Sequence, residues 1–174
     1  MDLAVLDLRV SQSSAGWQAE FGGQVWPCAI GRGGVSDDKS EGDGATPAGC
    51  WAIRRVLYRP DRLERPATIF PCDPLRPHDG LCDAPGDPHY NSLVRLPYEG
   101  RHERLWRDQG VYDCIVVLGY NDRPVRDGAG SAIFLHIARP DFTPTEGCVA
   151  LMKDDLLAFL GAAGASTRVC VAPP

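Results

Sequence analysis

The stretch from Ile133 to Leu151, IFLHIARPDFTPTEGCVAL, joins an apolar run to a turn-rich segment and then to a second short apolar run. Residues 131–138 are rich enough in β-branched and aromatic side chains to predict a central strand, and His136 lies near its end. Cys148 follows a Thr-Glu-Gly turn. Because a free thiol is mostly protonated at neutral pH, a nucleophilic cysteine needs a base beside it. The stretch therefore predicts a thiol active site made of His136 and Cys148.

The roles within this pair follow from the chemistry of acyl transfer. His136 would take the proton from the thiol, and Cys148 would attack a carbonyl carbon. The backbone amides of Gly147 and Cys148 would point at the developing oxyanion. Three kinds of group could orient the imidazole: Asp141, Glu146 or a backbone carbonyl.

Outward from this stretch, alternating and apolar segments predict a mostly β domain. A second central strand is expected over residues 113–120 (DCIVVLGY), separated from the first by the turn-rich NDRPVRDGAG. Four further features are expected: a strand over residues 3–10, a hairpin over 17–30 that turns at Gly22-Gly23, a strand over 50–58 and a last strand over 167–171. Residues 153–163 predict a helix, because acidic residues occupy its first turn and leucines share one face.

The middle of the chain is richer in proline and has no lasting periodicity. Residues 59–97 predict a long ordered excursion, with Ile69, Phe70, Leu81, Tyr90 and Leu93 as the side chains that would anchor it to the core. Residues 101–109 predict a short helix. No repeat or composition break divides residues 1–174, so the prediction is one mainly β domain (β-rich α+β) with one or two short helices.

The composition narrows the classes of function. The chain has 174 residues, a net charge of −5 and only two lysines, which argues against a nucleic-acid partner. No apolar run approaches the ~18 residues of a membrane span, and the amino terminus lacks the basic start of a signal peptide. The glycine-rich loop over residues 31–49 lacks phosphate-binding and calcium-binding spacings, and no cysteine-histidine pattern has zinc spacing. We therefore expect no phosphate-binding loop, calcium site or structural zinc.

Seven cysteines leave at least one thiol without a partner in the chain. Cys28, Cys114 and Cys170 lie in apolar, strand-like runs and are expected to be small buried hydrophobic residues. Cys72 and Cys82 lie in a loop rich in proline and aspartate, where a disulfide between them is possible and would imply an oxidising compartment.

GDGATPAG in the loop, a β-rich middle, a histidine at a strand end and TEGCVAL together resemble the L,D-transpeptidase catalytic domain, or YkuD domain, from about Gly31 to Leu160. The family's Ser/Thr-x-Gly-Cys pattern maps onto Thr145, Gly147 and Cys148, and its preceding histidine onto His136. The resemblance implies a YkuD-like β-sandwich that acts without metal or organic cofactor on peptidoglycan stem peptides.

The reaction implied by the resemblance starts with thiolate attack on the amide before the terminal D-alanine of a stem tetrapeptide. D-alanine leaves, and an amine from a second stem resolves the acyl-enzyme. Water could replace the amine, which would make the protein an L,D-carboxypeptidase or murein hydrolase. A noncatalytic cell-wall-binding module and an unrelated cysteine peptidase are the other hypotheses. The substrate implies a location in the cell envelope or periplasm.

Three departures from the family pattern concern the substrate contacts. Ile137, Glu146 and Ala150 stand where glycine, histidine and arginine are more common. Thr145 and Glu146 are expected to contact the substrate, and Arg139 is the best substitute for a carboxylate-binding arginine. Tyr120 and Asn121, at the end of the predicted strand 113–120, either line the cleft or form a turn.

Overall fold

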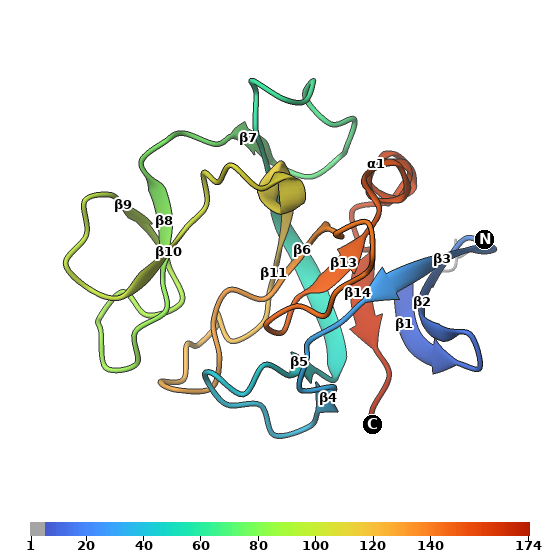
Figure 1. Ribbon diagram of the computed structural model, residues 1–174, viewed down its shortest axis with the longest axis horizontal. Helices are drawn as coiled ribbons and strands as arrows, with labels where there is room; N and C mark the ends of the chain where they lie inside the picture. The colour runs from blue at the N-terminus through green and yellow to red at the C-terminus, as the bar shows by residue number, and fades with distance from the viewer. Residues whose placement is uncertain (1–5) are drawn as a thin grey trace.

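The protein, described here by a computed structural model that covers residues 6–174, consists mainly of β-strands with one α-helix (Figure 1). The large sheet contains β1 (Leu8–Ser13), β2 (Gly16–Phe21), β3 (Gln24–Ala29), β6 (Gly49–Tyr58), β7 (Cys72–Pro74), β11 (Cys114–Leu118), β12 (Phe134–Ile137), β13 (Val149–Leu151) and β14 (Arg168–Val171). The other elements are β4 (Val35–Ser36), β5 (Thr46–Pro47), β8 (Asp79–Cys82), β9 (Leu93–Arg95), β10 (His102–Arg104), the 3-10 turn η1 (Gly110–Tyr112) and α1 (Lys153–Ala162). The mainly β fold with one helix is confirmed.

The large sheet closes on itself. Its strands follow the order β11-β12-β13-β3-β2-β1-β14-β6-β7, and β11 pairs with β6 as well as with β12. Because β6 is hydrogen-bonded on one side to β14 and on the other to β11, eight strands form a continuous ring. Closure satisfies backbone groups that would otherwise be exposed at sheet edges.

Both faces of the central strands are buried, which explains why β11 and β12 are almost continuously apolar. Val116 and Leu135 point inward to a core that α1 also covers, where the Phe159 ring lies edge-on to Phe21 at 5.0 Å. Ile115 and Phe134 point outward to a second apolar cluster. That second cluster lies under the excursion that carries β8, β9 and β10, so the excursion buries the outer face of the sheet.

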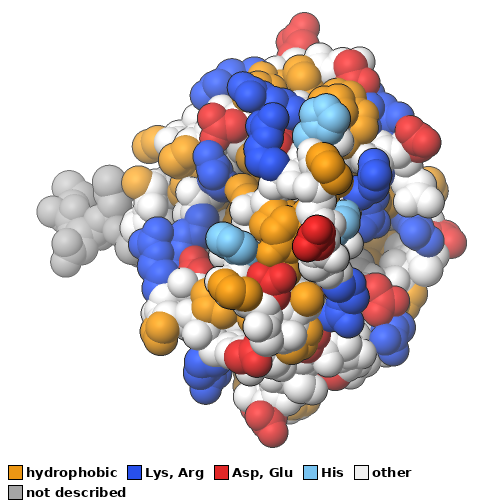
Figure 2. All heavy atoms as spheres, turned by 90° about the vertical axis from the view of Figure 1, so that its left-hand side faces the viewer, with side chains coloured by type: hydrophobic (Ala, Val, Ile, Leu, Met, Phe, Trp, Pro, Cys, Tyr) orange, Lys and Arg blue, Asp and Glu red, His pale blue; other side chains and the backbone are white. Residues whose placement is uncertain are grey.

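The small sheet β10-β8-β9 stands apart from the closed sheet, to its left in Figure 1. Figure 2 shows the molecule from this side, where basic, acidic and apolar side chains are interspersed and no single type covers the surface. Within residues 6–174, no helix has the length and apolar character needed to cross a bilayer.

Most of the predicted elements are confirmed with small shifts at their ends. The hairpin of β2 and β3 turns at Gly22-Gly23 as predicted, and β6, β11, β12, β14 and α1 lie within the predicted segments or within one residue of them. Among the described residues, the first strand begins at Leu8, and residues 3–5 of the predicted strand lie outside the described part of the chain.

The predicted helix over residues 101–109 is wrong. Residues 102–104 form β10, which pairs antiparallel with β8 so that His102 lies opposite Cys82. Leu105 is completely buried against the outer apolar cluster, so strand pairing and burial outweigh the weak local preference for helix. Phe70, Leu81 and Tyr90 anchor the excursion as predicted, but Ile69 and Leu93 are exposed.

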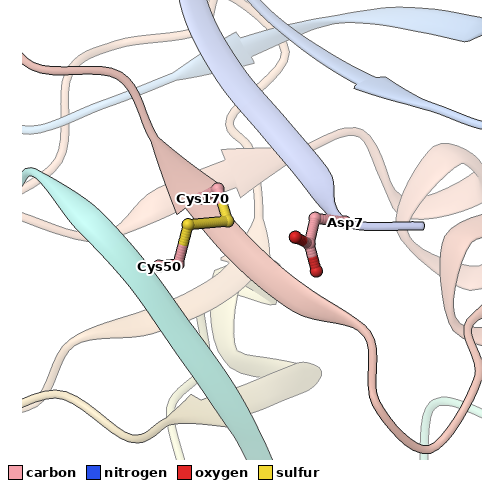
Figure 3. A group of neighbouring side chains, drawn as sticks. All are labelled: Asp7, Cys50 and Cys170. Atoms are coloured by element: carbon pink, nitrogen blue, oxygen red, sulfur yellow. A yellow bond between two sulfur atoms is a disulfide. The ribbon is translucent and has the colours of Figure 1, made fainter. Parts of the chain in front are cut away.

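A disulfide joins Cys50 of β6 to Cys170 of β14, which are direct partners in the antiparallel ladder (Figure 3). The expectation that Cys170 is a plain buried residue is therefore wrong, whereas Cys28 and Cys114 are buried free thiols as predicted. Cys72 and Cys82 are also free and buried, so the disulfide considered between them does not form. They belong to strands of two different sheets.

Candidate active site

The ladder between β12 and β13 brings His136 and Cys148 to one face. The two strands run parallel, with Leu135 opposite Val149 and His136 opposite Ala150. Cys148 directly precedes β13 and lies beside Phe134, whose N–H donates to the Cys148 Sγ at 3.4 Å. Because side chains alternate along a strand, residues 136 and 148 both project from the outer face of the sheet. Both line the same cleft there.

A backbone carbonyl orients the imidazole. His136 Nδ1 lies 2.9 Å from the Ile137 carbonyl oxygen. The other two candidates are engaged elsewhere: Asp141 accepts from Thr143, and Glu146 pairs with Arg32 at 2.8 Å. Since a carbonyl can only accept a hydrogen bond, Nδ1 carries the proton of the neutral ring. Nε2 is then left with a lone pair, as a general base requires.

The thiol is held by the backbone of the segment that leads into β12. Cys148 Sγ donates to the carbonyl oxygen of Ala132 at 3.2 Å. Ala132 has a φ of 55°, which is uncommon for a residue with a side chain. Its N–H donates to Asn91 Oδ1 at 3.1 Å. A loop residue of the excursion thus stabilises the conformation that presents this carbonyl to the sulfur.

The Thr145 hydroxyl organises the turn before the cysteine. It donates to the Cys148 carbonyl oxygen at 2.6 Å and accepts the N–H of Gly147 at 3.1 Å. The Gly147 amide is therefore hydrogen-bonded within the turn. The prediction that it is free to bind an oxyanion does not match this geometry. Gly147 itself has a φ of 133°, and a Cβ there would lie 2.8 Å from the Ala45 carbonyl oxygen, so the turn requires glycine.

The cleft has a volume of about 780 Å³ and lies between the outer face of β12 and β13 and the segment around β10. Of the predicted substrate contacts, Thr145, Glu146 and Arg139 line it. Glu146 and Arg139 are exposed, and Glu146 is bridged to Arg32 across the mouth. The Thr145 hydroxyl, by contrast, is engaged in two hydrogen bonds within the turn.

Tyr120 and Asn121 are not among the residues that line this cleft. The Tyr120 ring packs edge-on to Trp51 at 5.0 Å, and its hydroxyl donates to the Ala129 carbonyl oxygen. The Asn121 side chain bonds to backbone groups of Arg126 and Gly130. Of the two interpretations of this pair, the turn is the one that the structure supports.

Burial keeps both members of the candidate pair neutral. Removal from solvent raises the pKa of the Cys148 thiol to about 12, and the negative charge of Glu103 adds to this effect. Burial also lowers the pKa of His136 to about 4, despite the hydrogen bond that Nδ1 donates to the Ile137 carbonyl. At neutral pH the resting pair is thus a thiol beside a neutral imidazole rather than an ion pair.

Three residues from a part of the chain that sequence reasoning did not connect to the site also line the cleft: Glu103, Arg107 and Tyr112. The Tyr112 ring lies edge-on to His136 at 5.3 Å and to Phe134 at 5.8 Å. The only local signal was the density of charged residues around 101–107. That density did not indicate a contact with His136, because the contact depends on the packing of two segments that are distant in the sequence.

One cluster of potential metal ligands lies outside the cleft. Among residues 6–174, the one group of potential ligands that lie close together is Asp7, Cys50 and Cys170 (Figure 3). Both thiols of that group are consumed in the disulfide, and Asp7 pairs with Arg168 at 2.7 Å. The group therefore stabilises the junction of β6, β14 and the start of β1 and does not fit a metal ion.

Comparison with known proteins agrees with the geometry. The family model of the YkuD L,D-transpeptidase catalytic domain matches residues 17–171, which is nearly the whole chain. Searches of curated proteins and of solved structures found no significant match. The strand-borne histidine and the cysteine after a Thr-x-Gly turn lie within the matched residues, as do the strands of the closed sheet from β3 onward. The chain therefore belongs to the YkuD family of L,D-transpeptidase catalytic domains.

Proposed function

We propose that this protein is an L,D-transpeptidase that acts on peptidoglycan stem peptides, with Cys148 as nucleophile and His136 as general base. The observation that carries the proposal is the parallel register of β12 and β13, which places both side chains on one face and in one cleft. The hydrogen bond from Nδ1 to the Ile137 carbonyl supports the base role, because it leaves Nε2 unprotonated.

Acylation begins with the neutral pair. As Sγ attacks the amide carbonyl carbon of the donor stem, its proton passes to His136 Nε2, and no free thiolate has to accumulate. The imidazolium then gives this proton to the nitrogen of the departing D-alanine as the C–N bond breaks. The products are a thioester on Cys148, a free amino acid and a neutral His136.

Deacylation reverses the proton transfers. An acceptor amine loses a proton to His136 and attacks the thioester carbonyl, and the sulfur leaves as a thiol after it regains that proton. The oxyanion formed in each step needs a backbone donor. With the Gly147 amide bonded to Thr145, the Cys148 amide is the donor that we assign to this task.

We assign the substrate contacts to the charged residues at the mouth of the cleft. Arg139 is exposed, lies three residues after His136 and would pair with a carboxylate of the stem peptide. Glu146 and Arg32, which pair with each other and also line the cleft, would meet the acceptor. Thr145 contributes through the turn that carries the nucleophile, so we no longer assign it a direct contact.

Two features support a location in the cell envelope. The family's substrate, peptidoglycan, lies there. The Cys50–Cys170 disulfide is the kind of cross-link that persists in oxidising compartments and is rare in the cytosol.

Intact-mass spectrometry with a disaccharide tetrapeptide and with a carbapenem tests this function. The expected result is an adduct on the wild-type protein that is absent from Cys148→Ala, together with released D-alanine and a crosslinked product. Cys82→Ala is the matched control, because Cys82 is also a buried free thiol but does not line the cleft.

The products distinguish the alternatives. D-alanine without crosslinks would show that water is the acceptor and that the protein is an L,D-carboxypeptidase. Cleavage of ordinary L,L-peptides would indicate a different cysteine peptidase. Equal behaviour of wild type and Cys148→Ala toward both compounds would refute catalysis and favour a cell-wall-binding module.

A further inference from the structure

A partly buried network outside the catalytic pair connects the small sheet to His136. The Tyr112 hydroxyl donates to Glu103 Oε1, and Arg107 Nη2 donates to the same oxygen at 2.6 Å. The Arg107 guanidinium also lies over the Tyr112 ring, 4.4 Å from its centre. Glu103 comes from β10 and Tyr112 from η1, so the network joins two separate elements at the roof of the cleft.

The Tyr112 ring transmits this restraint to the imidazole. It is 6% exposed and lies between Phe134 and His136, with ring centres 5.8 and 5.3 Å away. Two contacts therefore restrain the His136 ring: the hydrogen bond from Nδ1 to the Ile137 carbonyl and the edge-on packing of the Tyr112 ring. If Tyr112 moved, the imidazole would lose this ring contact and keep its hydrogen bond to the Ile137 carbonyl.

The same network sets charges beside the sulfur. The Glu103 carboxylate opposes ionisation of Cys148, whereas Arg107 and Lys39 favour it. Arg107 and Arg139 oppose protonation of His136. The other charged or titratable side chains that line the cleft are Arg32, Glu41, Asp83, His102, Arg104 and Glu146. Of the acids at the cleft, Glu103 is the one whose charge acts directly on the thiol.

We propose that Glu103, Arg107 and Tyr112 are positioning residues, which hold the His136 ring in the cleft that Cys148 also lines. The Glu103 carboxylate lines the same cleft and adds to the effect of burial, which keeps the thiol protonated. A protonated thiol resists oxidation and unspecific acylation, and transfer to His136 is then limited to productive complexes. This inference rests on the function proposed above. It adds residues that the Thr-x-Gly-Cys pattern does not contain.

Two measurements on folded protein separate this role from plain structural support. The first is the pH dependence of Cys148 alkylation by iodoacetamide, read at residue 148 by peptide mass spectrometry. The second is the rate of Cys148 acylation by a carbapenem. Glu103→Gln removes the negative charge but keeps the size and a hydrogen-bonding group. Thermal unfolding confirms that each variant is folded.

For Glu103→Gln we expect the two measurements to change in opposite senses. The alkylation midpoint should fall by about one pH unit, because one opposing charge near the sulfur is lost. Acylation should slow by about tenfold or more, because a loosened His136 delivers less general-base catalysis. A purely structural defect would impair both reactions together and would overturn the proposal, as would a folded variant with both values unchanged.

Tyr112→Phe keeps the ring and removes only the hydroxyl, so it tests the network if Glu103→Gln does not fold. It should slow carbapenem acylation by about tenfold, and an unchanged rate would count against the proposal. Tyr98→Phe is the matched control: its hydroxyl also donates to a carboxylate, that of Asp87 at 2.8 Å, but Tyr98 does not line the cleft.

The alkylation profile does not depend on the proposed enzymatic reaction. If wild-type Cys148 is not acylated by either donor, the proposed function fails, while the midpoints of wild type and Glu103→Gln still report whether Glu103 controls the thiol. If acylation occurs but the midpoints coincide, the function stands and the network proposal falls.

Discussion

Thr145→Val tests whether the Thr145 hydroxyl holds the nucleophile's turn or contacts substrate. Valine has nearly the shape of threonine, but it can neither donate to the Cys148 carbonyl oxygen nor accept the Gly147 N–H. Each bond contributes about 1 kcal/mol, and the groups left behind are partly buried, so the expected loss of stability is about 2 kcal/mol. For a domain of this size that corresponds to a fall in melting temperature of roughly 4–8 °C.

The assay combines urea unfolding with carbapenem acylation of Cys148. Because the turn sets the position of Sγ, acylation should slow as stability falls, and Thr145→Ser, which keeps the hydroxyl, should restore most of both. Thr143→Val is the matched control in the same loop, since the Thr143 hydroxyl bonds only to exposed Asp141. A Thr145→Val protein with wild-type stability but weaker donor binding would refute the turn role and restore a direct substrate contact.

Three further predictions follow from the same structure. Replacing Cys50 and Cys170 together by serine should lower the free energy of unfolding by about 2–5 kcal/mol, because their disulfide closes a loop with a sequence separation of 120. A reductant should lower the melting temperature of the wild type but not that of the double variant. The pKa of His136 is lowered from 6.5 to about 4 on folding, so stability should decline as pH falls through this window. Urea midpoints should show a smaller decline for His136→Asn. Gly147→Ala should lower the free energy of unfolding by about 3 kcal/mol, because it places a Cβ 2.8 Å from a backbone oxygen at a φ of 133°. It should also abolish Cys148 acylation, and urea unfolding and mass spectrometry measure the two effects.

Local patterns predicted the β framework well because burial of one or both faces of a strand leaves a direct mark on residue order. The apolar runs at β11 and β12 and the diglycine between β2 and β3 are such marks. Local preference failed at residues 102–104, where pairing with β8 decides the conformation. It also failed for the cysteines, because the partner of Cys50 lies 120 residues away and is chosen by strand register.

The candidate site divides in the same way. The sequence predicted His136 and Cys148 as the candidate pair, because a strand end and a tight turn are local features. It also gave the Gly147 amide an oxyanion role, whereas in the structure this amide bonds to Thr145. It left three candidates for the group that orients the imidazole, and the structure identifies the Ile137 carbonyl. Backbone carbonyls have no sequence signature, which is why only coordinates could choose.

By itself, then, the sequence determined the strand framework and singled out Cys148 and His136 as the candidate thiol and imidazole, since alternation of apolar residues and turn chemistry act over a few positions. Only the tertiary structure decided which faces meet. The parallel register of β12 and β13 brings His136 and Cys148 together, and the excursion places Glu103 and Tyr112 above them. These contacts depend on the packing of segments far apart in the chain, where a shift of one residue in register would turn each side chain to the opposite face.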